Sequence, residues 1–400
     1  MTFPWLEVVD QARRRWGTPF YLAAWQPVQM AIDELAALSG VGIPVRHWLS
    51  VKTQPVKPLL LSWRRLLPYG VEVVSQFELL AVKEAGFKNE DIVVNGPGKH
   101  AWLPEGIGGL HVHLDSLQEV VAIGPRRLSS YRLGLRCHVA EEYDPDEKSF
   151  GAQFGVVDEE ASKVVEILAS HKLELEGIHF HLRSNVRDVN SYGRALEQGL
   201  KLARELGIAP KYVDCGGGLP SPGELIWEEG QFIGDQVSLP RLADRLKLVI
   251  EKFPSVRELW FENGKYVTSR AGVLVVQILD IKERRECRYL ICDGGRTNHA
   301  LPSDWQEHNV ATLPRRTGPE VLTTICGPTC MAYDRLRRVP LPRNLAVGDY
   351  LIWFNAGAYH IPWETRFSHG LSNVVWCDEH MELSLARGAE SFKEWWGQWA

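Results

Sequence analysis

Short apolar runs alternate with segments of helical periodicity through the first two thirds of the chain. The helical segments, which carry apolar residues three and four positions apart, cover 76–85, 116–123, 159–170, 189–206 and 239–253. The apolar runs predict strands at 45–51, 71–75, 92–95, 110–114, 131–139, 173–181, 212–215 and 258–262. Eight strand–helix units within about 240 residues favour a (β/α)8 TIM barrel over an open sheet.

The pattern changes after residue 262. Helical periodicity nearly vanishes, and β-rich runs separated by turns take its place. These runs cover 273–281, 288–293, 321–326, 350–355, 373–377 and 381–385. We therefore predict an α/β protein with a barrel at 25–264 and a β-barrel-like or β-sandwich domain at 265–400. Three smaller predictions complete the outline: a lead-in at 1–24 that packs with the β domain, polar loops at 140–153 and 219–236, and a closing helix at 388–400.

Composition excludes several classes of partner. The formal net charge is −5 and no basic block is present, so neither nucleic acid nor an anionic membrane is an expected partner. No apolar run approaches the roughly 20 residues of a membrane span, and residues 1–15 lack the apolar centre of a secretory signal. The seven cysteines are scattered and form no metal-site CxxC pair, which indicates reduced thiols in a cytoplasmic protein.

Polar residues gather at the carboxyl ends of the predicted strands, where barrel enzymes carry their working groups. Lys52 ends the first strand. Its amine would form a Schiff base if it were held partly dry with a lowered pKa, whereas the simpler alternative is a surface lysine that closes a strand. The other strand-end candidates, in chain order, are Glu72, Ser75, Asn95, Lys99, Asp115, Arg136, His138, His179, His181, Ser184, Asp214 and Glu262.

Three successive glycines, Gly216, Gly217 and Gly218, follow the seventh strand. Without Cβ atoms, their backbone N–H groups can close on an anion, although a flexible turn is the alternative. Barrels often bind phosphate in the loops after strands seven and eight, and Gly264 and Lys265 follow the eighth.

A phosphate site, a lysine, an imidazole and a carboxylate are four groups that pyridoxal phosphate can use together. The phosphate anchors the cofactor and Lys52 binds it covalently. His181 can stack on the ring, and Glu262 can keep the ring nitrogen protonated. Taken alone, His181 could equally be a core histidine and Glu262 a surface charge.

These motifs resemble those of the fold-type III, alanine-racemase-like decarboxylases that use pyridoxal phosphate and include diaminopimelate and ornithine decarboxylases. The resemblance covers nearly the whole chain and keeps the order of the family's motifs. Six runs carry it: 50–52, 177–181 with Ser184 (similar to HxHxGS), 214–218, 262–266 (similar to EPGRY), 327–330 (similar to GPxC) and 354–359.

The resemblance implies an amino-acid decarboxylase that works as a homodimer with shared active sites. It implies that Lys52, His181 and Cys330 are catalytic, with Cys330 reaching the partner's site and handling the proton at Cα. It also implies that Tyr359 contacts the phosphate. The remaining residues that we assign to the cofactor are Glu72, Ser75, Arg136, Ser184, Gly216, Gly217, Gly218, Glu262, Gly264 and Lys265.

Departures from the family pattern bear on the substrate. Met331 replaces the acidic residue that holds a distal amine, and Leu301 stands where an arginine grips a distal carboxylate. A buried methionine cannot bind an ammonium group, so free ornithine, lysine and diaminopimelate fit poorly. Arg183, where glycine is usual, and Arg296 favour an anionic substrate arm, unless they are ordinary surface or dimer charges.

The runs 179–185 and 301–306 are similar to the carboxylate-siderophore branch, which decarboxylates a citryl-conjugated amino acid. That substrate is our main prediction, and a diaminopimelate or other diamino-acid decarboxylase is the alternative. A non-catalytic, regulatory homologue that binds pyridoxal phosphate is opposed by the presence of Lys52 and Cys330. A racemase is opposed by the GPxC-like run. A sugar-hydrolysing barrel built on Glu72 and Glu262 would leave the glycine loop unexplained.

Overall fold

The computed structural model describes residues 3–66, 68–140, 153–223, 225–228, 231–234, 237–285, 287–302 and 306–399. The chain divides into two compact units. The barrel unit consists of Ala31–Pro220 and Gln236–Tyr266, and the sheet unit consists of Met1–Met30, Ser221–Asp235 and Val267–Ala400. Most of the loop predicted at 140–153, and residues 303–305 of the siderophore-like run, lie outside the described residues.

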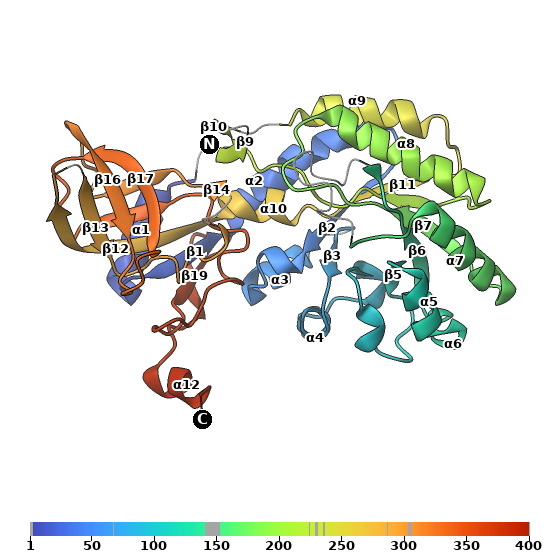
Figure 1. Cartoon of the computed structure of the whole chain (residues 1–400), viewed down its shortest axis with the longest axis horizontal. Coiled ribbons are helices and arrows are strands. Elements are labelled where there is room, and N and C mark those ends of the chain that lie inside the picture. Colours follow the sequence, from blue (N-terminus) through green and yellow to red (C-terminus); the bar gives the residue numbers. More distant parts are fainter. Residues whose placement is uncertain are drawn as a thin grey trace. The chain divides into compact units, whose positions relative to one another are not determined.

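Eight parallel strands close into a barrel in the order β11-β2-β3-β4-β5-β6-β7-β8 (Figure 1). They are β2 (Val45–Ser50), β3 (Gly70–Val73), β4 (Ile92–Val94), β5 (His111–Leu114), β6 (Arg132–Arg136), β7 (Leu175–His179), β8 (Tyr212–Asp214) and β11 (Glu258–Phe261). Each coincides with one of the eight predicted runs, so the barrel is confirmed. The β3, β4 and β5 strands are buried at every position, as expected for parallel barrel strands that are covered on both faces.

Helices alternate with the barrel strands. They are α2 (Trp25–Leu35), α3 (Lys57–Trp63), α4 (Gln76–Glu84), α5 (Leu117–Ile123), α6 (Pro125–Leu128), α7 (Asp158–Ser170), α8 (Val189–Glu205), α9 (Leu239–Ile250) and α10 (Gly264–Thr268), of which α2 and α10 cross the boundary between the units. The α8 and α9 helices lie side by side (Figure 1) and bury Leu196, Leu200, Leu242 and Leu246. Ser75 begins α4, where its hydroxyl accepts the Glu78 N–H, a standard N-cap.

The sheet unit contains a nine-stranded sheet in the order β17-β16-β13-β12-β1-β19-β20, with β18 beside β12 and β15 beside β18. Its strands are β1 (Phe20–Ala24), β12 (Gly272–Glu283), β13 (Arg288–Cys292), β15 (Val310–Leu313), β16 (Glu320–Cys326), β17 (Arg335–Pro342), β18 (Tyr350–Trp353), β19 (Asn373–Cys377) and β20 (Leu383–Arg387). The predicted C-terminal β domain is therefore present, and α12 (Phe392–Gly397) lies within the predicted closing helix.

A three-stranded sheet joins β9 (Leu225–Glu228), β10 (Gln231–Gly234) and β14 (Gln306–Glu307). The prediction of a loop at 219–236 was therefore wrong in its centre. The apolar runs 225–227 and 232–233 are too short to predict strands among the surrounding Gly, Pro and Glu. They become strands through pairing with each other and with β14, which is distant in sequence.

The core of the sheet unit joins the N-terminal residues to strands from the far end of the chain. Val9 and Ala12 of α1 (Trp5–Trp16) are buried in one cluster with Leu22, Val275 and Val375. The β1 strand pairs antiparallel with β12 and parallel with β19, which fixes this arrangement. Among the described residues, no helix is both long and apolar enough to cross a bilayer.

Candidate active site

Lys52 and Glu72 form an ion pair at the carboxyl ends of neighbouring barrel strands. The Lys52 Nζ atom lies 2.9 Å from each carboxylate oxygen of Glu72. The Glu72 side chain is 1% exposed and that of Lys52 is 35% exposed, so the amine covers a buried charge while remaining accessible. Lys52 was predicted to end the first strand. The β2 strand instead stops two residues earlier, at Ser50. Lys52 lies in the turn Val51–Thr53, which the Thr53 hydroxyl closes by donating to the Ser50 carbonyl.

Asn95 links this pair to the second carboxylate of the site. Its amide nitrogen donates to Glu262 Oε1 and lies 3.5 Å from Glu72 Oε1. Its amide oxygen is 2.8 Å from Nδ1 of His113 and must accept, so Nδ1 carries the proton. Nε2 of His113 then accepts from the Tyr212 hydroxyl at 3.2 Å. This buried chain of hydrogen bonds fixes the orientation of Asn95 and therefore the positions of both carboxylates.

Glu262 and Asp214 are buried carboxyl groups with opposite pKa shifts. Burial opposes the charge of Glu262, but His179, His181 and Lys52 outweigh burial and hold its pKa well below the ordinary value. Burial and the charge of Glu262 together raise the pKa of Asp214 far above its ordinary value. Neighbouring carboxyl groups separate in this way when only one of them can ionise. Ionisation is therefore favoured at Glu262 over Asp214.

The glycine loop holds the imidazole of His181. The Gly217 N–H donates to Nδ1 of His181 at 3.2 Å, which leaves the ring proton of neutral His181 on Nε2. A Cβ atom at Gly216, where φ is +62°, would lie 2.6 Å from the Phe180 carbonyl and 2.8 Å from Nδ1 of His181. Glycine is thus required for the loop to approach the ring. The side chain of His181 remains 32% exposed beside the buried Glu262 carboxylate, 3.6 Å away.

The residues present fit pyridoxal phosphate. The amine of Lys52 and the ring of His181 are both partly exposed, whereas the carboxylates of Glu72 and Glu262 beneath them are buried. Lys265, after β11, donates to the Asn185 side chain at 2.8 Å, which brings the loops after β7 and β11 together. A partly exposed imidazole, an accessible amine and a close-packed glycine loop together suit a flat cofactor with one anionic end.

Other predicted cofactor residues of the barrel unit have structural partners. Arg136 ends β6, 3.7 Å from Asp115. Ser75 is a helix cap, and Ser184 is exposed in the loop after β7. Gly264 lies so close to β2 that a Cβ atom there would be 2.6 Å from the Cβ of Ser50. The cofactor roles of these four residues stay predictions.

Four predicted residues belong to the sheet unit: Arg296, Cys330, Met331 and Tyr359. The buried Asp334 carboxylate holds two of their loops together by accepting the backbone N–H of Arg296 at 2.8 Å and that of Thr329 at 3.0 Å. Cys330, the residue after Thr329, is exposed.

Met331 is 41% exposed in the single chain. The sequence interpretation treated it as buried, so this chain alone does not support excluding an ammonium group there. Tyr359 stacks on Trp363 with ring centroids 5.0 Å apart and has a φ of +69°, which is rare for a bulky residue. The roles of the four sheet-unit residues stay predictions.

The sequence interpretation assigned no role to Asn95, His113, His179 or Tyr212. The rings of His113 and His179 stack with centroids 4.7 Å apart inside the barrel. Asn95 and His179 stood at strand ends and could have been assigned by position. His113 and Tyr212 lie within short apolar strands, and the only signal for them was a polar side chain interrupting an apolar run.

Buried neutral histidines make the folded protein sensitive to acid. Burial lowers the pKa of His47 to about 4, of His111 to about 2 and of His113 to about 3, from an ordinary 6.5. Below pH 6.5 the unfolded chain binds protons that the folded chain does not, so stability falls as pH falls. Each histidine contributes about 1.4 kcal/mol per pH unit. Glu78, whose pKa burial raises to about 7, opposes them.

We expect the free energy of unfolding in urea to fall by on the order of 3 kcal/mol between pH 6 and pH 5. His111→Gln should reduce that slope, whereas replacement of the exposed His380 should leave it unchanged. A protein whose stability is constant or rises over this interval would show that these histidines titrate normally.

The chain matches two family models and is similar to several known proteins. The family model described as pyridoxal-dependent decarboxylase, pyridoxal binding domain, matches residues 43–269, and that of the C-terminal sheet domain matches 228–357. Diaminopimelate decarboxylase of Aquifex aeolicus is 29% identical, over 84% of this chain and 81% of its own. The 2-[(L-alanin-3-ylcarbamoyl)methyl]-2-hydroxybutanedioate decarboxylase of Staphylococcus aureus is 28% identical, over 72% and 77%. The diaminopimelate decarboxylase structure from M. jannaschii with L-lysine has a TM-score of 0.84 at 20% identity, covering 98% of this chain and 94% of its own.

Proposed function

This chain belongs to the pyridoxal-dependent decarboxylase family, whose members are carboxy-lyases that act on amino acids with pyridoxal phosphate, and we propose that its catalytic site is built on Lys52, Glu72, His181 and Glu262. The observation that carries this proposal is the accessible Lys52 amine, 2.9 Å from the buried Glu72 carboxylate, on the barrel end that also holds Glu262. A substrate amine can reach Lys52 there, while both carboxylates are shielded from water.

When bound, pyridoxal phosphate withdraws the electron pair that loss of CO2 leaves on the substrate α-carbon. Lys52 supplies the amine that attaches the cofactor, and Glu72 holds a proton on that amine when it is free. Glu262, kept ionised by its neighbours, supplies the negative charge that holds a proton on the ring nitrogen. Asn95 keeps the Glu262 and Glu72 carboxylates apart and in place. His181, which Gly217 orients, would pack its flat ring against the bound cofactor.

The substrate proposed first is a diamino acid of the diaminopimelate class. The relatives favour this alternative over the siderophore prediction, because diaminopimelate decarboxylases predominate among them. The exposure of Met331 removes one objection to such a substrate, since an exposed side chain leaves room for water or a further group beside a distal ammonium.

A citryl-conjugated amino acid is the second candidate. One relative, at 28% identity, is named as a decarboxylase of an alanine unit linked to a hydroxybutanedioate. Besides the carboxylate of the alanine unit, that compound has two more carboxylates and a hydroxyl group. The absence of an acidic side chain at Met331 and the presence of Arg183 support this candidate. Arg183 is half-buried in the loop after β7, directly beside the glycine loop, where its carbonyl oxygen would be 2.9 Å from a Cβ atom at Gly218.

Release of CO2 from a substrate panel separates the two candidates. We expect turnover of diaminopimelate by the enzyme loaded with pyridoxal phosphate, and Arg183→Gln should change it little. Turnover of a citryl conjugate instead, reduced on the order of 10-fold or more in Arg183→Gln, would establish the second candidate. Arg187→Gln serves as the matched control from the same loop. Release from neither compound, nor from ornithine or lysine, would contradict both.

Cys330 is proposed to act in the site of a partner subunit of a homodimer, where it supplies the proton to the substrate α-carbon. Cys330→Ala should retain the cofactor and lose turnover by on the order of 10²-fold or more. Cys287→Ala provides a control in the same unit. Mixing Cys330→Ala with an inactive Lys52→Arg variant should restore part of the activity, since one mixed site then contains both native residues. Full activity of Cys330→Ala would contradict the role.

A further inference from the structure

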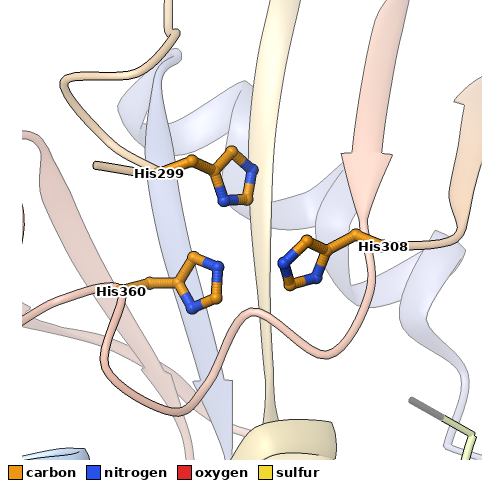
Figure 2. Close-up of side chains that lie close together, drawn as sticks. All are labelled: His299, His308 and His360. Carbon is orange, nitrogen blue, oxygen red and sulfur yellow. The ribbon is translucent and has the colours of Figure 1, made fainter. Parts of the chain in front are cut away.

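Three histidines from separate segments of the sheet unit surround one small space. His299 follows β13, His308 lies between β14 and β15, and His360 follows β18. All three side chains are buried, and one ring nitrogen from each lies within 4.8 Å of the others. Figure 2 shows the three rings facing one another. The proposed decarboxylase site uses none of these three histidines. None of the six family-like runs contains them, although one run ends at Tyr359, next to His360.

Two of the rings are held in one tautomer by backbone carbonyl groups. Nδ1 of His308 lies 2.7 Å from the Phe354 oxygen, and Nδ1 of His360 lies 2.8 Å from the Ala358 oxygen. A carbonyl oxygen can only accept, so Nδ1 carries the proton in both rings and Nε2 of the neutral ring carries a lone pair. A backbone carbonyl that fixes the outer nitrogen is also the usual support of a metal-binding histidine.

His299 completes the cluster. Neither of its ring nitrogens has a hydrogen-bond partner among the described residues, although both are buried. Trp353 packs edge-on against this ring, with centroids 5.0 Å apart. A buried nitrogen without a partner is costly and requires an explanation, and a bound ion would supply a partner for one of the two.

We propose that His299, His308 and His360 bind one divalent transition-metal ion, with zinc as the best match. Imidazole favours zinc, copper and nickel over magnesium or calcium. Three histidines with a fourth position for water or hydroxide form a common zinc arrangement. Bonds of about 2.0–2.1 Å place tetrahedral ligand atoms about 3.3 Å apart, so the nitrogens need to close by at most about 1.5 Å.

The bound ion would tie together three loops of the sheet unit. Three neutral imidazoles leave the double positive charge of the zinc ion uncompensated. A hydroxide as the fourth ligand would offset part of that charge. An ion that binds the folded state but not the unfolded state stabilises the folded state. The gain in the free energy of unfolding grows with the logarithm of the ratio of ion concentration to dissociation constant. The site is therefore expected to raise the resistance of the enzyme to unfolding whatever substrate the barrel accepts.

The test uses the full-length enzyme loaded with pyridoxal phosphate, stripped with a chelator and titrated with zinc chloride. We expect one zinc per chain by elemental analysis and a higher unfolding midpoint. X-ray absorption at the zinc edge should show nitrogen and oxygen neighbours at about 2.0–2.1 Å, with the signature of three imidazoles. Failure of the wild-type protein to take up zinc, or a spectrum with fewer than three imidazoles, would overturn the proposal without any variant.

Variants then locate the ion. His308→Ala and His299→Ala should each weaken zinc binding by on the order of 100-fold, and replacement of the exposed His380 by alanine should not. The other buried set capable of holding a metal, His113, His179 and Glu262, belongs to the site described above and stays intact in these variants. Undiminished zinc in both variants would assign the ion to that set or to the surface and overturn the proposal.

Discussion

Lys52→Arg is expected to abolish covalent attachment of pyridoxal phosphate and to lower turnover by on the order of 10³-fold or more. Arginine keeps a cation beside the buried Glu72 carboxylate, which alanine would leave uncompensated, but it has no primary amine. The loss therefore reports on the chemistry of the amine rather than on folding. Absorbance of the lysine-bound cofactor and release of CO2 measure the two effects separately.

A chemical label identifies the lysine directly. Borohydride reduction of the wild-type enzyme followed by digestion should yield the cofactor on the peptide that contains Lys52. Lys57→Arg is the matched control, because Lys57 is close in sequence but exposed and paired with Glu84 on the surface. Recovery of the label on Lys99 or Lys265, the other lysines that follow barrel strands, would refute the assignment.

Glu262→Gln is expected to retain the cofactor and lower turnover by on the order of 10²- to 10³-fold. Glutamine keeps the size of the side chain and can still accept from Asn95, but it has no charge with which to hold a proton on the ring nitrogen. The pKa of Asp214, which the charge of Glu262 helps to raise, should fall in this variant. Turnover and the cofactor spectrum are compared across pH.

Glu258→Gln provides the control on the same strand. Glu258 begins β11 at the opposite end, where it accepts from the Trp260 indole at 2.8 Å. Residues at that end of a barrel contribute to stability rather than to catalysis. Its replacement should leave turnover near the wild-type level. Equal losses in both variants would indicate a structural role for Glu262, and an unchanged rate in Glu262→Gln would remove it from the proposed site.

The eight-stranded barrel and the gathering of candidate site residues at one end of it were predictable from the chain itself. Short runs with mainly apolar residues indicate strands buried on both faces, and the intervening helical periodicity favours parallel connections. The carboxyl ends of such strands converge, so Lys52, Glu72 and Glu262 could be placed together before any coordinates. The small strands β9 and β10 could not, because their pairing with each other and with β14 decides their conformation.

The sequence alone determined the barrel, the sheet domain and the set of candidate side chains at the strand ends, because local periodicity and strand ends depend on neighbouring residues. Tertiary structure decided which groups share protons and charge. Asn95 bridges Glu72 and Glu262, although Glu262 lies 167 residues further along the chain than Asn95. His299, His308 and His360 meet through three loops that no motif connects. Burial and distance set the pKa of a group or its ability to bind a metal, and both arise only when remote segments pack together.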